Sequence, residues 1–235
     1  MWLAALLFLS IGVGDLSRPR DDSRRPWRAL IAAAVGTGTA AIAIGLANTP
    51  WPWLAVVAAV ALVWNLTSAL LPERWSLLPV AVLVVAVAVS LAFPGAVPAP
   101  SGALATWFDA LRYDALAATS LERAALLVGY SVFLLQSANR VVVGVLGLTD
   151  ARLKRGALQL KGGRIIGPLE RLFILWMAVA GQALAVSAII DAKSILRFPE
   201  IRDSGKGSAR GVLAEYVLVG SLVSWGLALI VVPIH

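Results

Sequence analysis

Long apolar segments alternate with short polar segments along almost the whole chain. A helix needs about 20 apolar residues to cross about 30 Å of hydrocarbon, and most of the apolar segments are close to that length. They comprise residues 2–13, 29–47, 54–71, 77–93, about 124–148, about 169–190 and 212–232. This pattern predicts an all-α fold, a polytopic bundle of transmembrane helices with about seven spans, or six if one segment is re-entrant.

The segment between the fourth and fifth spans has a different pattern. Prolines interrupt the chain in residues 94–100, and residues 104–118 then mix large apolar side chains with Asp and Arg. This mixture predicts one short helix that lies in the membrane interface. We therefore expect a single integral membrane domain (1–235), made of apolar spans (1–93), an interfacial connector (94–120) and polar-lined spans with basic loops (121–235).

Composition supports a membrane protein and excludes several kinds of chemistry. Hydrophobic residues make up 60% of the chain and charged residues only 14%, against about 25% charged residues in soluble domains. The chain has no cysteine, which excludes disulfides, iron–sulfur clusters, Cys-ligated zinc and thiol catalysis. His235 is the only histidine, so a His-based metal site or Ser-His-Asp triad is not expected. We expect no metal and no cofactor.

The formal net charge of +7 comes from basic residues in short loops between the apolar spans. Such a distribution favours orientation in the membrane and attraction to anionic lipid over nucleic-acid binding. With the N-terminus outside, the loops after spans one, three and five are cytoplasmic and hold most of the Lys and Arg. The same alternation places the basic loop 191–211 outside, against the positive-inside rule. Either this loop is an exception, or one segment is re-entrant and the later loops change sides.

A glycine-rich basic segment precedes the sixth span. Lys161 and Arg164 flank Gly163, and Pro168 suits the first turn of the helix that follows. A helix N-terminus beside two cations is a physically sound site for a phosphate or a carboxylate. The alternative is a basic cytoplasmic loop that ends at Pro168, with Glu170 complementing the helix dipole.

Arg140 falls within the fifth span. An arginine inside a membrane is costly and is by default a functional hypothesis with a charged partner. Candidate partners are Glu170 and Glu215, near the ends of the neighbouring spans. The alternative is that the span ends near Asn139, so that the Arg140 side chain extends to the interface.

Lys193 and Arg197 are four residues apart, so a helix continuing out of the sixth span would place both on one face. Two cations on one face could bind an anionic headgroup, or they could form a solvated helix end. Glu215, at the entrance of the last span, is expected to pair with Arg140, Lys193 or Arg197. Other polar residues inside the spans are expected to make interhelical hydrogen bonds: Asn65, Thr67, Ser68 and Gln182.

Several short motifs between residues 161 and 224 carry a resemblance to a known family. They are Gly163-Arg164-Ile165-Ile166-Gly167, Leu169-Glu170-Arg171-Leu172, Gly181-Gln182, Ala192-Lys193-Ser194-Ile195-Leu196-Arg197-Phe198 and Ala214-Glu215-Tyr216 with Leu218, Gly220 and Ser224. This set resembles the C-terminal signature of an uncharacterised family of bacterial multi-pass membrane proteins, over about a third of the chain. Near the N-terminus, Gly14-Asp15-Leu16 is faintly similar to the family's Asp-Phe segment, with Ser17-Arg18 in place of Leu-Gln. The resemblance implies a membrane location and a bacterial source, and it implies no activity.

These observations predict a protein of the bacterial cytoplasmic (inner) membrane that binds or translocates an anionic ligand or a lipid headgroup without catalysis. The predicted ligand-binding residues are Arg140, Lys161, Gly163, Arg164, Lys193 and Arg197, with Glu170 and Glu215 as charge partners. One alternative is a membrane enzyme acting on a lipid headgroup, with Glu170 or Glu215 as its base. Another is a structural or regulatory subunit. Stripes of small residues in the second and seventh spans also suggest a homo-oligomer.

Overall fold

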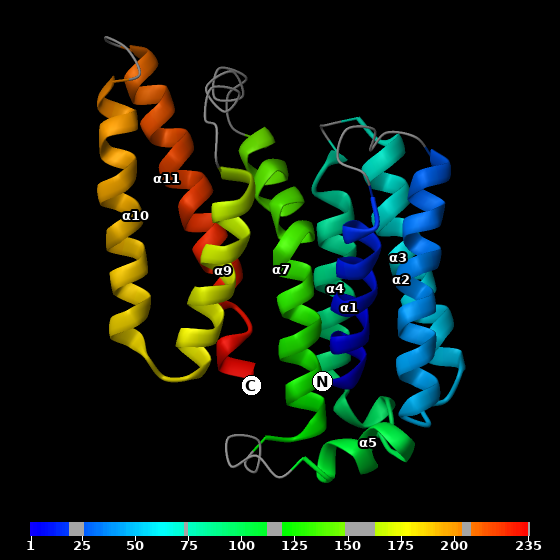
Figure 1. The fold of residues 1–235 in the computed structure, drawn as a ribbon. Coiled ribbons are helices and arrows are strands. Elements are labelled where there is room, and N and C mark those ends of the chain that lie inside the picture. Colours follow the sequence, from blue (N-terminus) through cyan, green and yellow to red (C-terminus); the bar gives the residue numbers. More distant parts are fainter. Residues whose placement is uncertain (19–25, 73–74, 112–118, 149–162, 204–207, 235) are drawn as a thin grey trace. The chain divides into compact units, whose positions relative to one another are not determined.

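The computed structural model describes residues 1–18, 26–72, 75–111, 119–148, 163–203 and 208–234 (Figure 1). Within these residues all regular structure is helical, with nine α-helices, two short 3₁₀ helices and no strand. The α-helices are α1 (Trp2–Leu16), α2 (Pro26–Leu46), α3 (Pro52–Leu70), α4 (Leu78–Ala92), α5 (Gly102–Asp109), α7 (Leu121–Leu148), α9 (Gly163–Val179), α10 (Ala183–Asp203) and α11 (Ser208–Leu229). The predicted all-α class is confirmed.

Three of these helices are long and apolar enough to cross a membrane: α2, α3 and the part of α7 over Leu121–Gly147. They indicate a membrane protein. The other apolar helices that the structure describes are shorter, namely Trp2–Leu16, Leu78–Ala92 and Val217–Leu229. Helix length and composition therefore do not support the count of about seven full-length spans.

The chain divides into two compact units, residues 1–137 and residues 138–235. The long helix α7 contributes its first part to one unit and its last part to the other. Each unit has its own helix packing. The prediction of a single membrane domain concerns the chain as a whole and stays a prediction.

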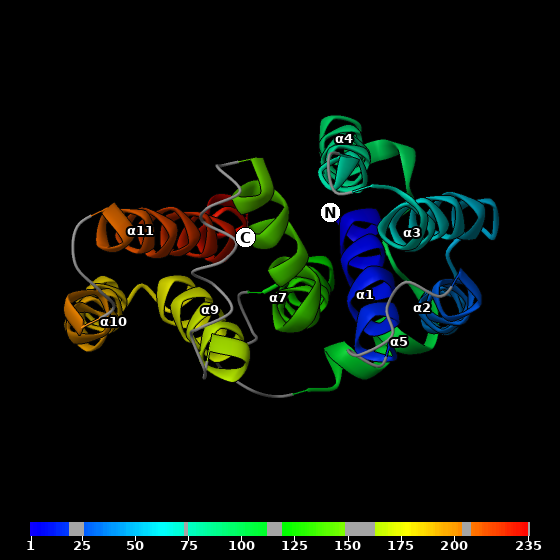
Figure 2. The ribbon, with the colours of Figure 1, turned by 90° about the horizontal axis from the view of Figure 1, so that it is seen from above.

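In the first unit, α1 is the central helix, although it has only 15 residues (Figure 2). It contacts α2, α3 and α4, and glycines let its backbone approach its neighbours. A Cβ on Gly36 of α2 would clash with the Ser10 carbonyl oxygen, and one on Gly129 of α7 would lie 2.6 Å from the Ala5 oxygen. Small residues at such contacts are typical of helices packed in a membrane.

Aromatic rings fill the contact between α1 and α7. The Phe8 ring centroid lies 4.8 Å from that of Tyr130 and 5.2 Å from that of Phe133, both edge to face. Trp64 of α3 closes the cluster, with its ring centroid 5.9 Å from that of Phe133. Edge-to-face and tilted pairs at these distances add to the stability gained by burial alone.

The end of α2 is fixed by a left-handed residue and a side-chain hydrogen bond. Asn48 has a φ of 49°, and the Thr49 amide donates to the Ile44 carbonyl at 3.0 Å, which is the Schellman pattern. The buried Trp2 indole then donates to Thr49 Oγ1 at 2.9 Å. The interfacial helix expected over residues 104–118 corresponds to α5, which ends at Asp109; residues 112–118 lie outside the described residues.

In the second unit, the prediction of one helix for the sixth span (169–190) is wrong, because this segment forms parts of two helices, α9 and α10. The chain turns back at residues 180–182, between α9 and α10. Gly181 has a φ of +71°, its amide donates to the Ala178 carbonyl at 3.0 Å, and the Gln182 amide donates to the Met177 carbonyl at 2.8 Å. This Schellman motif ends α9 and starts a helical hairpin, because a left-handed glycine satisfies the last carbonyls and redirects the chain.

The hairpin brings several helix ends together. Within the second unit, α9 begins, α10 ends and α11 begins at the same end, and α11 runs parallel to α9 (Figure 1). The start of α9 also differs from the expectation, because Pro168 lies inside the helix and not in its first turn. Proline has no amide hydrogen, so the bond from residue 168 to residue 164 is missing in this turn.

Candidate functional site

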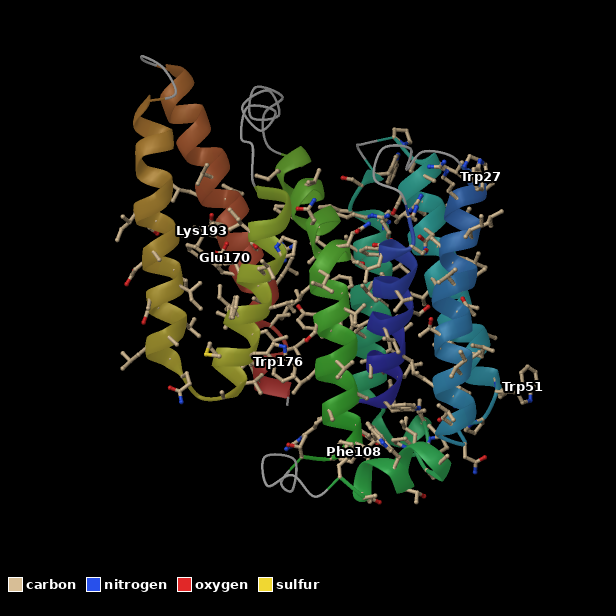
Figure 3. All side chains as sticks on the ribbon, viewed as in Figure 1. Trp27, Trp51, Phe108, Glu170, Trp176 and Lys193 are labelled. Atoms are coloured by element: carbon tan, nitrogen blue, oxygen red, sulfur yellow. The ribbon has the colours of Figure 1, made fainter. Side chains whose placement is uncertain are left out.

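The helices α9, α10 and α11 meet at a cluster of one acid, one base and one indole (Figure 3). Lys193 Nζ of α10 lies 2.7 Å from Glu170 Oε2 of α9. The Trp225 indole of α11 donates to the other carboxylate oxygen, Oε1, at 2.5 Å. Lys193 Nζ also lies 5.4 Å from the centroid of the Trp225 ring, a cation–π distance. The cluster therefore links all three helices through one carboxylate.

A second polar contact lies beside the first. Arg171 Nη1 donates to Ser224 Oγ at 3.3 Å, and both residues are buried. Arg171 follows Glu170 on α9, and Ser224 precedes Trp225 on α11, so adjacent residues of one helix contact adjacent residues of the other. Two neighbouring polar links thus set the register between α9 and α11.

The two members of the ion pair differ in accessibility. The Glu170 side chain is 6% exposed, whereas the Lys193 side chain is 19% exposed. Burying a carboxylate is costly unless it is both paired and hydrogen-bonded, and Glu170 has an ammonium on one oxygen and an indole N–H on the other. The cluster is therefore electrostatically compensated, with its cation on the more accessible side.

The other predicted site residues are placed in different ways. Arg140 lies within α7, which continues to Leu148; whether the membrane span ends near Asn139, so that the Arg140 side chain extends to the interface, stays a prediction. Gly163 and Arg164 are the first two residues of α9, Arg197 belongs to α10, and Glu215 belongs to α11. The side chains of Arg164, Arg197 and Glu215 lie outside the described part of the chain. Lys161 lies outside the described residues. The structure thus brings together two of the predicted residues, Glu170 and Lys193.

A second buried polar cluster, in the first unit, was missed by the sequence analysis. Asp15, at the end of α1, is fully buried and accepts a hydrogen bond from Trp64 Nε1 at 3.1 Å. Gln136 Nε2 donates to the Asp15 backbone oxygen at 2.6 Å. Arg18, two residues beyond the end of α1, donates from Nη1 to Asn65 Oδ1 of α3 at 3.4 Å. Two sequence features could have indicated this cluster: the resemblance around Asp15, and the polar Asn65 inside an apolar segment.

Three other predicted interhelical hydrogen bonders are not found in that role. Thr67 and Ser68 donate to the carbonyls of Val63 and Trp64 in their own helix. Gln182 lies in the exposed turn between α9 and α10. A hydroxyl that donates to the carbonyl four residues earlier needs no partner on another helix.

The geometry of the second unit suits binding of charged groups. The ammonium of Lys193 is a donor for a phosphate or carboxylate, and the Glu170–Trp225 pair is an acceptor site for an ammonium. Among the residues that the structure describes, no group of three or more His, Cys, Asp or Glu side chains could hold a metal ion.

No protein-family model matches the chain, no curated protein is significantly similar in sequence, and no solved structure is significantly similar in fold. The resemblance of residues 161–224 to a bacterial membrane-protein family therefore stays a prediction.

Proposed function

We propose that this protein is a multi-pass protein of the bacterial inner membrane that binds anionic lipid headgroups or small anions on one basic face, without catalysis. The observation that carries the proposal is the hairpin between α9 and α10. A helical hairpin returns to the membrane face from which it started, whatever depth it reaches. It therefore changes the side assigned to every loop after Gly181.

The hairpin supports an orientation without the conflict between the basic loops. With two antiparallel helices in place of one span, the connection after α10 returns to the same side as the connection before α9. That side is also reached by the connections after α1 and α3, because α7 runs parallel to α1 and its 28 residues are enough for one crossing. Of the 20 Lys and Arg residues, only Arg112, in the segment before α7, and Arg123, in the first turn of α7, then belong to the opposite side.

The register of α1 and α7 supports this reading of their direction. The N-terminal amine lies 3.8 Å from Glu122 at the start of α7. Toward the other end of α1, Gln136 of α7 donates to the Asp15 backbone oxygen. Both helices therefore advance in the same direction through the first unit.

Exposed tryptophans support the membrane boundaries. Trp27, in the first turn of α2, and Trp51, the residue before α3 begins, lie at opposite ends of the first unit's helices (Figure 3) and are exposed. Trp75 and Trp107 are also exposed and close to helix ends. Amphipathic rings favour the headgroup region, and the 21 residues of α2 span about 30 Å, the thickness of the hydrocarbon core.

A basic face of this kind favours anionic lipid, since each Lys or Arg near a charged leaflet contributes about 1 kcal/mol. The segment between α7 and α9 contributes Arg152, Lys154, Arg155 and Lys161, with Arg164 in the first turn of α9. We include Arg140 and Arg197 as further ligand residues. Self-association through small-residue stripes stays a prediction.

The test compares lipid retention by purified variants in native mass spectrometry. Wild-type protein should retain phosphatidylglycerol in preference to phosphatidylcholine. Replacing Arg152, Lys154, Arg155 and Arg164 by Gln should lower that preference at least tenfold, because roughly 1.4 kcal/mol corresponds to tenfold. The control replaces Arg112 and Arg123 by Gln on the opposite side and should change it little. Equal retention of both lipids by the wild-type protein would overturn the proposal.

A further inference from the structure

The described side chains of α10 are less buried than those of α9 and α11. Among its described side chains, residues 183–195, none is fully buried. Leu184 is 86% exposed and Ile195 is 71% exposed. The ion pair of Lys193 with Glu170 joins this described part of α10, which has no buried side chain, to α9.

The pair is accessible from the Lys193 side. Its ammonium end is the more exposed of the two side chains, and the neighbours Asp191, Ala192 and Ser194 on α10 are exposed. A ligand that approaches α10 thus meets the Lys193 ammonium before it meets the Glu170 carboxylate. This order of contact favours an anionic ligand, because the more accessible group is a cation.

Glu170 keeps a hydrogen bond if Lys193 leaves. Trp225 Nε1 donates to Glu170 Oε1, and this bond joins α9 to α11 without involving α10. Lys193 would in turn exchange one anionic oxygen for another. The exchange therefore preserves a charge-assisted partner for the ammonium and leaves the carboxylate with a donor, which lowers its cost relative to breaking an isolated buried pair.

We propose that the Glu170–Lys193 pair is a latch that a phosphate group opens. The phosphate replaces Glu170 as the partner of Lys193, and α10 then separates from α9 and α11. This inference rests on the proposed function, because it assigns a ligand-binding step to Lys193. The phosphate can come from a lipid headgroup or from free inorganic phosphate, which offer the ammonium the same oxygens.

The distance between α10 and α11 reports the state of the latch. The chain has no cysteine, so Ser194→Cys on α10 and Leu222→Cys on α11, both exposed, can carry spin labels without background. In maltoside micelles, which contain no phosphate, the labelled protein should show one short distance. Phosphatidylglycerol should add a population at a longer distance. The same change with inorganic phosphate would show that the phosphate alone is sufficient, and no change with either source would overturn the latch.

Two substitutions distinguish a latch from a permanent structural pair. Both Lys193→Gln and Glu170→Gln should produce the longer distance in micelles without lipid. Retention of phosphatidylglycerol should then move in opposite directions: it should fall with Lys193→Gln, which removes the phosphate partner. It should rise with Glu170→Gln, which removes the competing carboxylate, in each case by roughly tenfold, because a hydrogen bond to a charged group is gained or lost.

Asp191→Asn is the matched control for Glu170→Gln, because it removes one exposed acid from α10 and changes the net charge equally. Lys193→Arg keeps the positive charge and should keep the response to lipid. If Glu170→Gln and Asp191→Asn retain phosphatidylglycerol equally, the pair is structural and the latch is wrong. If wild-type protein retains phosphatidylglycerol but its spin-label distance never changes, the latch fails while the proposed function stands.

Discussion

Asp15 combines two unfavourable conditions, burial and a position at the C-terminal end of a helix, where the dipole repels a carboxylate. Trp64 Nε1 offsets part of this cost as a donor. We expect Asp15→Ala to lower the free energy of unfolding by about 1–3 kcal/mol, because it leaves the buried indole N–H without its acceptor. Asp15→Asn keeps an acceptor oxygen and should cost less.

A double-mutant cycle measures this interaction directly. Trp64→Phe removes the donor, so the combination of Asp15→Ala with Trp64→Phe should cost less than the sum of the single losses. Reversible unfolding in micelles, followed by circular dichroism, gives the three values. Additive losses would show that the two side chains are not coupled.

At the residue scale, sequence predicts which side chains carry charge into the apolar segments but not how they pair. The sequence points to both Glu170 and Lys193. It offers Arg140 as a candidate partner for Glu170, and Glu215 as a candidate partner for Lys193. Their actual pairing depends on the register across the α9–α10 hairpin. That register is set by the turn at Gly181. Gly181 is more than two helical turns along the chain from either side chain, and an uncharged glycine gives no indication of which charges pair.

At the element scale, the sequence does not predict the hairpin, because apolar residues flank its turn on both sides. Residues 174–180 and 183–190 are almost entirely apolar, so a window of about 20 residues sees one continuous span. Gly181 and Gln182 are the only interruption, and a lone glycine is tolerated inside a helix. The glycine is decisive here because its positive φ ends α9. Neighbouring spans with charged or proline-containing turns, such as α2 and α3, were predicted closely.

Glycines on α2 give a prediction at this scale. Gly36 faces the backbone of α1 at Ser10, whereas a Cβ on Gly38 would meet nothing within 4 Å. Gly36→Ala should lower the free energy of unfolding by about 1–3 kcal/mol, since two helix backbones must separate to admit the methyl group. Gly38→Ala should leave stability unchanged or raise it by up to about 1 kcal/mol through helix propensity.

Thermal unfolding of both glycine variants in the same detergent checks this expectation. The two positions lie on one helix and receive the same substitution, so helix propensity cancels in the comparison. An equal melting temperature for Gly36→Ala and Gly38→Ala would mean that α1 and α2 are not in close backbone contact.

For the whole molecule, the side of the membrane on which each basic loop lies depends on the number of times the chain crosses the membrane. Composition indicates a membrane protein, and helix length and hydropathy give three candidate spans among the described residues. Neither decides which side the later loops occupy. A single sixth span would place the basic residues between 191 and 211 opposite the other basic loops, whereas a hairpin places them together. The positive-inside rule favours the hairpin, and a direct measurement can separate the two arrangements.

Single cysteines in the cysteine-free chain provide that measurement. We expect Ser17→Cys and Ser208→Cys to react with a membrane-impermeant maleimide from one side of sealed vesicles and Ser120→Cys from the other; Gln182→Cys should react from the Ser120 side if the hairpin crosses the membrane and resist labelling if it is re-entrant. Ser17 follows α1, Ser208 begins α11, Ser120 precedes α7, and Gln182 lies in the turn between α9 and α10. Labelling after the vesicles are opened with detergent controls for reactivity. With a single sixth span, residue 182 would lie within the membrane and resist labelling, and Ser208→Cys would label from the side opposite to Ser17→Cys. That pattern would refute the shared basic face, because only the hairpin returns the chain to the side from which α9 began.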